Sequence, residues 1–197
     1  MTKRIFSVLL AFIMLSALVL PLGGIANAAT TNSALWVPNV SPGSTTQLGG
    51  LYISESNAMS IKDGDWVTIS LPSYVDLGKM TFNFTDSTSY FPKSSSKYVV
   101  TFGDDKYKIG NTEFDYGAEA TLHEDSAAPN SKLNLQALNR QTVVLHVAKA
   151  PAQPHARTFR TYIYFDEVRI QPVAPEELES SDIKVTLDAP STSGFSS

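Results

Sequence analysis

The sequence contains no cysteine. A chain without cysteine forms no disulfide, offers no thiolate nucleophile and binds no metal through sulfur. Redox switching through thiols is excluded for the same reason. The stability of the fold must therefore come from burial of apolar side chains, from strand pairing or from assembly with other chains.

Histidine is scarce, and the sequence patterns of common enzymes are missing. The three histidines, His123, His146 and His155, stand in separate contexts, without the spacing of a zinc or copper site. The serines lie in polar loops without the Gly-x-Ser-x-Gly pattern of a hydrolase. Asp166 and Glu167 are neighbours in an expected strand, so they point to opposite faces and cannot flank one glycosidic bond. The sequence predicts a protein that is not an enzyme.

Only one long apolar run is present, and it lies at the N-terminus. Lys3 and Arg4 precede the apolar residues 5–20, and Ala26-Asn27-Ala28 supplies the small residues that signal peptidase requires. We expect cleavage after Ala28, with residues 1–28 as a signal peptide. An uncleaved membrane anchor is the alternative, because the run approaches the length that spans a bilayer. With cleavage, the chain is secreted to the extracellular side or the cell surface and has no membrane partner.

The net charge of the chain is small and negative. The formal net charge is −4, and removal of Lys3 and Arg4 makes it more negative. An acidic protein is a poor partner for nucleic acid or for anionic membranes. Cations and cell-wall polymers remain compatible with this charge.

The rest of the chain alternates apolar and polar residues in short runs separated by Gly, Pro, Asn, Asp and Ser. This pattern is typical of strands. The expected strands are residues 33–37, 47–54, 66–71, 80–84, 98–102, 114–123, 142–148, 159–171 and 183–187. About nine strands predict an all-β fold, a single antiparallel β-sandwich with Greek-key, immunoglobulin-like or jelly-roll-like connections.

Some segments allow finer expectations. The alternation in 142–148 predicts a central strand buried on both faces, and residues 133–139 are expected to form a short helix or an irregular strand that crosses between sheets. In 159–171 the alternation puts Phe165 and Glu167 on one face and Tyr164 and Val168 on the other. We expect residues 29–49 to form an N-terminal strand and linker, and residues 50–197 to form the sandwich domain.

Two stretches resemble a known family. Residues 51–77, "LYISESNAMSIKDGDWVTISLPSYVDL", and residues 180–194, "SSDIKVTLDAPSTSG", resemble β-sandwich modules of secreted and cell-surface proteins of Gram-positive bacteria. In that family such modules accompany S-layer-type repeats and copper-amine-oxidase-like N-terminal stalk domains. The resemblance implies a fold and a location at the cell surface rather than a reaction.

No cofactor is expected, although calcium could bind to acidic turns. Carboxylate and carbonyl oxygens on β-loops suit this cation. The candidate acids are Asp63, Asp65, Asp104, Asp105 and Asp115, with solvated loops as the alternative. The run His123-Glu124-Asp125 comes nearest to a metal-ligand cluster, but its place at the end of a strand favours a solvated turn.

Two non-catalytic functions fit these features. The first is a structural protein that forms a homo-oligomer or polymer, such as a filament or surface layer, by β-strand addition. The N-terminal segment would be the added strand, with Leu35, Trp36 and Val37 as anchors and with Ala34 and Trp36 on one face. A strand paired within its own chain is the alternative.

The second function is a carbohydrate-binding or adhesive module for a cell-wall glycan. It needs aromatic side chains on an exposed face, for which Trp36, Trp66, Tyr162 and Tyr164 are candidates. The face rich in Tyr and Arg in 159–171 could also be a secondary contact surface for assembly.

Overall fold

The computed structural model describes residues 30–36, 40, 41, 43–57, 60–84, 96–125, 131–150, 158–172 and 183–196. This part of the chain contains 13 strands and no helix. The strands form two antiparallel sheets, which confirms the predicted β-sandwich. Within the same residues, no helix is long and apolar enough to cross a membrane.

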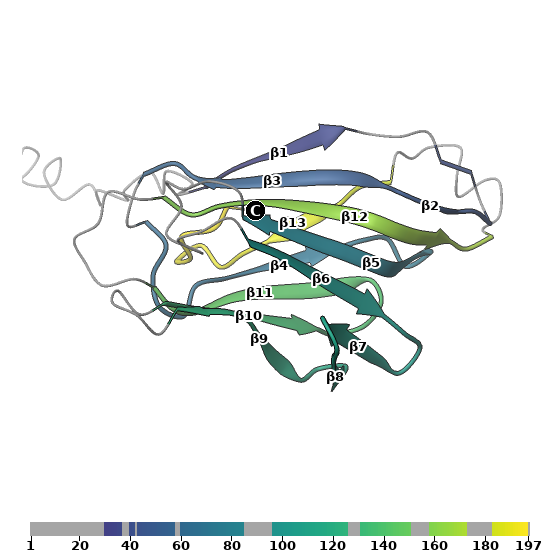
Figure 1. The fold of residues 1–197 in the computed structure, drawn as a ribbon. Coiled ribbons are helices and arrows are strands. Elements are labelled where there is room, and N and C mark those ends of the chain that lie inside the picture. The colour runs from purple at the N-terminus through teal and green to yellow at the C-terminus, as the bar shows by residue number, and fades with distance from the viewer. Residues whose placement is uncertain are drawn as a thin grey trace, which may run out of the picture.

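In Figure 1 the larger sheet extends from β1 at the top to β7 and β8 at the bottom, and the strands of the smaller sheet overlap its lower part. The larger contains β1 (Thr30–Trp36), β2 (Thr45–Thr46), β3 (Gly49–Glu55), β5 (Val75–Phe84), β6 (Ser96–Phe102), β7 (Lys106–Ile109), β8 (Thr112–Asp115) and β12 (Arg160–Ile170). The smaller contains β4 (Trp66–Ser70), β9 (Glu119–Asp125), β10 (Ser131–Ala137), β11 (Thr142–Lys149) and β13 (Thr186–Asp188).

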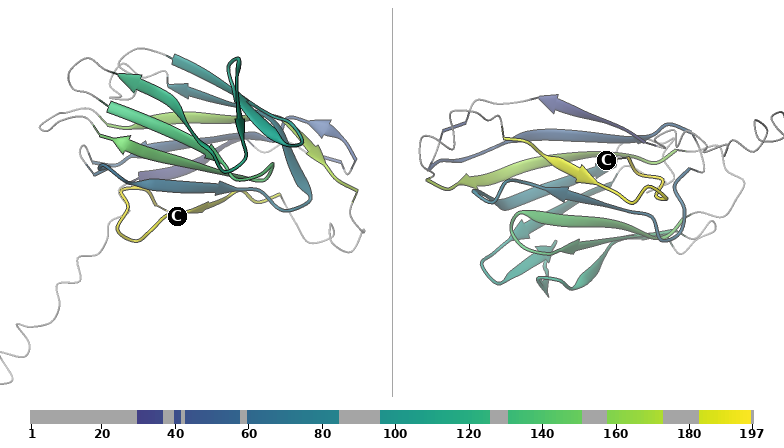
Figure 2. Two further views of the ribbon diagram at one scale, coloured as in Figure 1. Left: turned by 90° about the horizontal axis from the view of Figure 1, so that it is seen from below. Right: turned by 180° about the vertical axis from the view of Figure 1, so that it is seen from behind.

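Strands from distant parts of the sequence are neighbours in both sheets. The order in the larger sheet is β1-β3-β12-β5-β6-β7-β8, with β2 paired to β12, and the order in the smaller sheet is β13-β4-β11-β10-β9. β12 therefore lies between β3 and β5, which come about a hundred residues earlier in the chain. Figure 2 shows β12, in yellow-green, beside β3, whereas the yellow C-terminal strand β13 belongs to the smaller sheet.

The chain forms more strands than the nine predicted. Residues 114–123 are two strands rather than one, because Gly117 adopts a positive φ of 86° in a turn between β8 and β9. The short strand β7 was missed, and Gly110, with φ of 60°, makes the hairpin turn that joins it to β8. Residues 133–139 do not form a helix or cross between the sheets, since β10 pairs with β9 and β11 inside one sheet. The strand is irregular, as one of the two predictions had it, because the register shifts on both sides of Leu133.

Two predictions about strand faces were also wrong. β11 is central, but only Val143, Leu145 and Val147 are buried, and its other face is half-buried. In β12 the alternation holds as far as Phe165 and then changes, because the register shifts around Glu167. This irregularity turns Val168 to the inner face and leaves Glu167 exposed.

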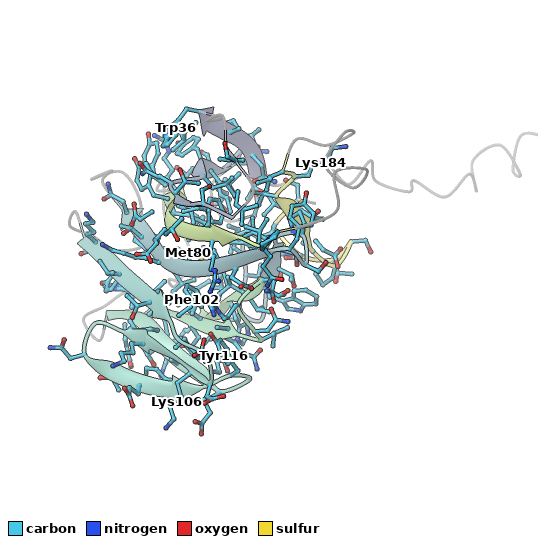
Figure 3. All side chains as sticks on the ribbon, turned by 90° about the vertical axis from the view of Figure 1, so that its right-hand side faces the viewer. Trp36, Met80, Phe102, Lys106, Tyr116 and Lys184 are labelled. Carbon is cyan, nitrogen blue, oxygen red and sulfur yellow. The ribbon has the colours of Figure 1, made fainter. Side chains whose placement is uncertain are left out.

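The core lies between the sheets, where buried Phe, Leu, Ile and Val side chains of both sheets meet. Figure 3 shows Met80 and Phe102 of the larger sheet inside this layer, with Trp36 at one extreme of the molecule and Lys106 at the other. Burial of a large apolar side chain stabilises a fold by about 1.5–3 kcal/mol. The core therefore supplies the stabilisation that disulfides provide in many secreted domains.

Tyr107 fastens the hairpin of β7 and β8 to the smaller sheet. Its side chain is fully buried, and its hydroxyl lies 2.7 Å from the carbonyl oxygen of Ala118 and 3.2 Å from that of Leu135. Its ring stacks on Phe114 at a centroid distance of 5.4 Å. Burial raises the pKa of Tyr107 to about 12, because the phenolate would have to exist away from water.

We predict that Tyr107→Phe lowers the free energy of unfolding by about 1–2 kcal/mol at neutral pH, because buried carbonyl oxygens lose their donor. The pKa of Tyr107 is higher in the folded state than the ordinary 10.0. Its contribution is therefore complete below pH 10 and is lost as the pH rises toward about 12. Urea unfolding at pH 7 and pH 11 should show a smaller difference between wild type and variant at pH 11. Tyr52→Phe, on the outer face, is the control, and equal stability of Tyr107→Phe and wild type at pH 7 would refute the prediction.

Candidate functional site

A buried carboxylate organises the stretch that follows β3. Glu55, the last residue of β3, is 3% exposed. Its Oε1 accepts hydrogen bonds from the backbone N–H groups of Ser60 at 2.6 Å and Ile61 at 2.9 Å, and its Oε2 accepts one from Phe159 N at 2.8 Å. Hydrogen bonds to a charged acceptor are stronger than neutral ones. Glu55 thus joins the end of β3, the following loop and the start of β12.

A second carboxylate joins this loop to the C-terminal segment. Asp65 is 9% exposed, and its Oδ2 accepts hydrogen bonds from Lys62 N at 2.7 Å and Gly194 N at 2.9 Å. Gly64, with φ of 85°, makes the turn between Lys62 and Asp65, as the sequence Asp-Gly-Asp suggests. Within residues 51–77, Glu55 and Asp65 therefore both have a structural role.

The C-terminal segment continues from this point to β1. Phe195 is buried, and its ring meets Phe159 edge to face at a centroid distance of 5.6 Å. Ser196 follows and binds the first residue of β1: its N–H donates to Thr30 Oγ1 at 2.9 Å, and its Oγ donates to Thr30 O at 2.6 Å. Asn32 Nδ2 donates to Ser196 O at 2.9 Å. We call these contacts of Ser196 with Thr30 and Asn32 the clasp.

β1 is an edge strand that pairs with β3 of its own chain, from Thr30 opposite Glu55 to Trp36 opposite Gly50. Because the register shifts between Ala34 and Trp36, Leu35 is an extra residue. Ala34 and Trp36 therefore do not share a face as predicted, since Ala34 opposes the inward-facing Leu51.

The two predicted anchors inside the described residues lie together at the end of β1. Leu35 is 36% and Trp36 41% exposed. The Cδ1 atom of Leu35 lies 2.8 Å, and Tyr164 Cδ1 lies 3.1 Å, from where a Cβ on Gly50 would stand. Gly50 thus leaves the space that Leu35 occupies on the outer face of the larger sheet. The third anchor, Val37, lies outside the described residues.

The predicted aromatic residues are divided between the two sheets. Tyr162 and Tyr164 lie on the outer face of the larger sheet, where Tyr162 pairs with Tyr52 at a centroid distance of 4.6 Å. Trp66 lies on β4 of the smaller sheet, opposite His146. Trp66 and the tyrosines therefore do not form one contact face, whereas Leu35, Trp36 and Tyr164 do come together around Gly50.

β1 differs in composition from the other strands at the sheet ends. Of the described strands, β1 and β8 end the order of the larger sheet, and β9 and β13 end that of the smaller. β8 carries Glu113 and Asp115, β9 carries three acidic residues, and β13 is three residues long. β1 has seven residues, TTNSALW, none of which is charged. Charges and shortness protect edge strands from pairing with other chains, so β1 is the least protected of the four.

The acidic turns do not come together. Among the described residues, no group of three or more His, Asp or Glu side chains could hold a metal ion. Asp63 Oδ1 accepts a hydrogen bond from Ala150 N at 2.6 Å, and Asp104, beside Asp105, pairs with Arg140 at 3.0 Å. Asp115 forms an ion pair on the surface of the β7–β8 hairpin.

The histidines occupy different sites. His123 is half-buried on β9, with Nδ1 2.5 Å from the hydroxyl of Tyr98, so it does not lie in a solvated turn as predicted. His146 Nδ1 lies 2.5 Å from Glu119 Oε1 on the outer face of the smaller sheet, and this hydrogen bond lowers the pKa of Glu119. His155 lies outside the described residues.

We predict that Gly194→Ala destabilises the fold by about 2 kcal/mol or more, because a Cβ there would lie 2.5 Å from Ser60 O and 2.7 Å from Ile61 Cα. Backbone atoms cannot move aside as a flexible side chain can. Chemical denaturation measures the change, and Thr192→Ala, at an exposed position of the same segment, is the control. Equal stability of the two variants would show that the segment is not held as described.

Comparison with known proteins identifies no relative. No family model matches the chain, no curated protein matches it, and no solved structure matches it. The geometry of this chain and its sequence are therefore the basis for inferring its function.

Proposed function

We propose that the protein is a secreted structural component of the cell surface or extracellular matrix, and that its copies assemble by exchanging strand β1. In this mechanism β1 of one copy leaves its own sheet and pairs with β3 of the next copy. Each exchange joins one copy to another in the same direction, so repetition produces a filament or layer. The N-terminal apolar run with its Ala26-Asn27-Ala28 site supports export.

The observation that carries the proposal is the position and composition of β1. It is a terminal strand of its sheet, it has no charged residue, and its last residues, Leu35 and Trp36, are two of the most exposed large hydrophobic side chains among the described residues. Exposed apolar side chains on an unprotected edge are typical of surfaces that meet another chain.

Exchange costs little free energy in contacts, because β1 would make the same pairs with β3 of another copy as with its own. The rest of the N-terminal segment is fixed by backbone bonds from Gly43 N to Ile170 O at 2.9 Å and by pairing of β2 with β12. Residues 37–42, Val-Pro-Asn-Val-Ser-Pro, connect these two parts. Six residues reach at most roughly 20 Å when fully extended, and this length limits the distance that the exchange can cover between copies.

A paired cysteine variant tests exchange directly, because the chain has no cysteine of its own. Thr31 and Ser54 are opposite each other in the β1–β3 ladder, at a separation that a disulfide can bridge. In the Thr31→Cys/Ser54→Cys variant, oxidation of assembled protein should give a ladder of disulfide-linked multimers on non-reducing gels. Oxidation of dilute protein should give an internally linked monomer that no longer assembles.

The controls are the reduced variant and a chain that begins at Val40, which retains the residues bonded to β12. Light scattering and negative-stain microscopy should find multimers or fibres for residues 29–197 and none for the shortened chain. Internally linked monomers alone, at every concentration, would contradict exchange.

A glycan-binding module is the second candidate, because the outer face of the larger sheet carries Tyr52, Tyr162 and Tyr164 beside Trp36. The Tyr52 and Tyr162 rings lie close and tilted by 31°, and flat aromatic faces are platforms for sugar rings. Polar side chains such as Arg160 and Asn83 flank them in the ladder.

If this module is correct, Tyr162→Ala should reduce co-sedimentation with insoluble cell-wall polysaccharide about tenfold, as loss of an aromatic contact of roughly 1–1.5 kcal/mol implies. Trp66→Ala, on the opposite sheet, should leave binding unchanged. Equal binding by both variants and wild type would remove this candidate.

A further inference from the structure

The clasp recognises side chains of β1 and not only its backbone. Main-chain pairing with β3 would accept almost any extended sequence. Ser196, in contrast, contacts the hydroxyl of Thr30 at 2.9 Å and the side-chain amide of Asn32 at 2.9 Å. Thr30 is buried, with 2% of its surface exposed, so its hydroxyl would lose hydrogen bonding if Ser196 were absent.

The position of Ser196 is itself fixed. Phe195 packs on Phe159, and Gly194 N donates to Asp65, where any larger residue would meet backbone atoms. A rigid acceptor with defined donors can distinguish ligands that differ by one hydrogen-bonding group. The clasp therefore has the properties of a recognition site rather than of a flexible tail.

The clasp also distinguishes registers. A shift of β1 by two residues along β3 leaves every side chain on the same face of the sheet. After such a shift toward the clasp, Asn32 would stand at the position of Thr30 and Ala34 at the position of Asn32. Ala34 has no side-chain donor for the carbonyl of Ser196, so the shifted register would lose this bond.

We propose that the slot formed by the edge of β3 and by Ser196 is a binding site for β1 of a second copy of this chain. The side chains of Thr30 and Asn32 identify the incoming strand and fix its register. This inference rests on the proposed function, because it names the partner and the residues that select it. It adds that the C-terminal segment of one copy selects the N-terminal strand of the next.

The experiment uses the full mature chain with Ser54→Cys as acceptor and synthetic peptides of residues 30–36 as donors. Each peptide carries cysteine in place of Thr31, opposite Ser54 in the native register. Peptides serve as donors because changes at Thr30 and Asn32 in the full chain would weaken the pairing of β1 in its own sheet as well as in another copy. The two effects on exchange would then offset each other. With oxidised glutathione as the oxidant, the disulfide-linked adduct is measured by mass spectrometry.

The native-sequence peptide should be captured, and a peptide with Thr30→Val and Asn32→Leu should be captured about tenfold less, because the side-chain bonds to Ser196 are lost. A Ser33→Thr peptide, changed at an exposed position away from Ser196, is the matched control and should behave as the native sequence. Equal capture of all three peptides, or no capture of the native sequence, would overturn the inference.

A second set of peptides tests the register and carries its cysteine in place of Ser33, with Thr31 unchanged. The native sequence should not link to residue 54 in this form, whereas the Thr30→Val/Asn32→Leu sequence should, because nothing prevents a two-residue shift. Unchanged register in the variant would overturn the inference. The linking of full chains through Thr31→Cys/Ser54→Cys is measured separately, so multimers that form without peptide discrimination would refute the clasp and leave strand exchange standing.

Discussion

The constraint on which the rest of the structure depends is the burial of two carboxylates among backbone N–H groups. Glu55 binds the N–H groups of Ser60, Ile61 and Phe159, and Asp65 binds those of Lys62 and Gly194. A buried backbone N–H without an acceptor costs as much as a lost hydrogen bond, so irregular chain segments need such acceptors. These two side chains let a loop, the start of β12 and the C-terminal segment meet at one end of the sandwich without regular pairing.

The first residues of β1 lie at the same end of the molecule, so the pairing of β1 depends on the C-terminal segment. Gly194 is placed by Asp65, Phe195 by the core and Ser196 by both, so the clasp on Thr30 follows from the carboxylates. At the other end of β1, Leu35 lies over Gly50, Trp36 pairs with Gly50 in the ladder, and both side chains remain partly exposed. β1 is therefore held firmly at its first residues and loosely at its last ones, so separation from β3 would begin at the end next to residues 37–42.

The sequence was sufficient for the fold class and for most strands, because alternation depends on one buried face and each strand carries its own pattern. The sequence was insufficient where a single turn or bulge interrupts that alternation. The turn at Gly117 divided one expected strand, and the irregularities near Leu35 and Glu167 reversed the faces of the residues beyond them. The site was less predictable still, because Phe159, one of the three partners of Glu55, and the partners of Ser196 lie more than a hundred residues away from them in the sequence. The glutamate in the "ESNAMSIKDGD" stretch was a visible signal, but nothing local indicates that a carboxylate will be buried.

The distribution of charge over the edge strands of the two sheets favours exchange of β1 over simple pairing of β1 with an edge strand of another copy. Simple addition would require β1 to pair with an edge of another copy, and the other described sheet ends, β8, β9 and β13, are acidic or short. Two β1 strands could pair with each other, but such a contact closes into a dimer and ends growth. Exchange into the slot beside β3 avoids both limits, because it uses the one surface whose complementarity to β1 is already present in a single copy. A cysteine-free domain would gain durability in this way, since separation of two copies requires loss of the ladder and of the clasp together.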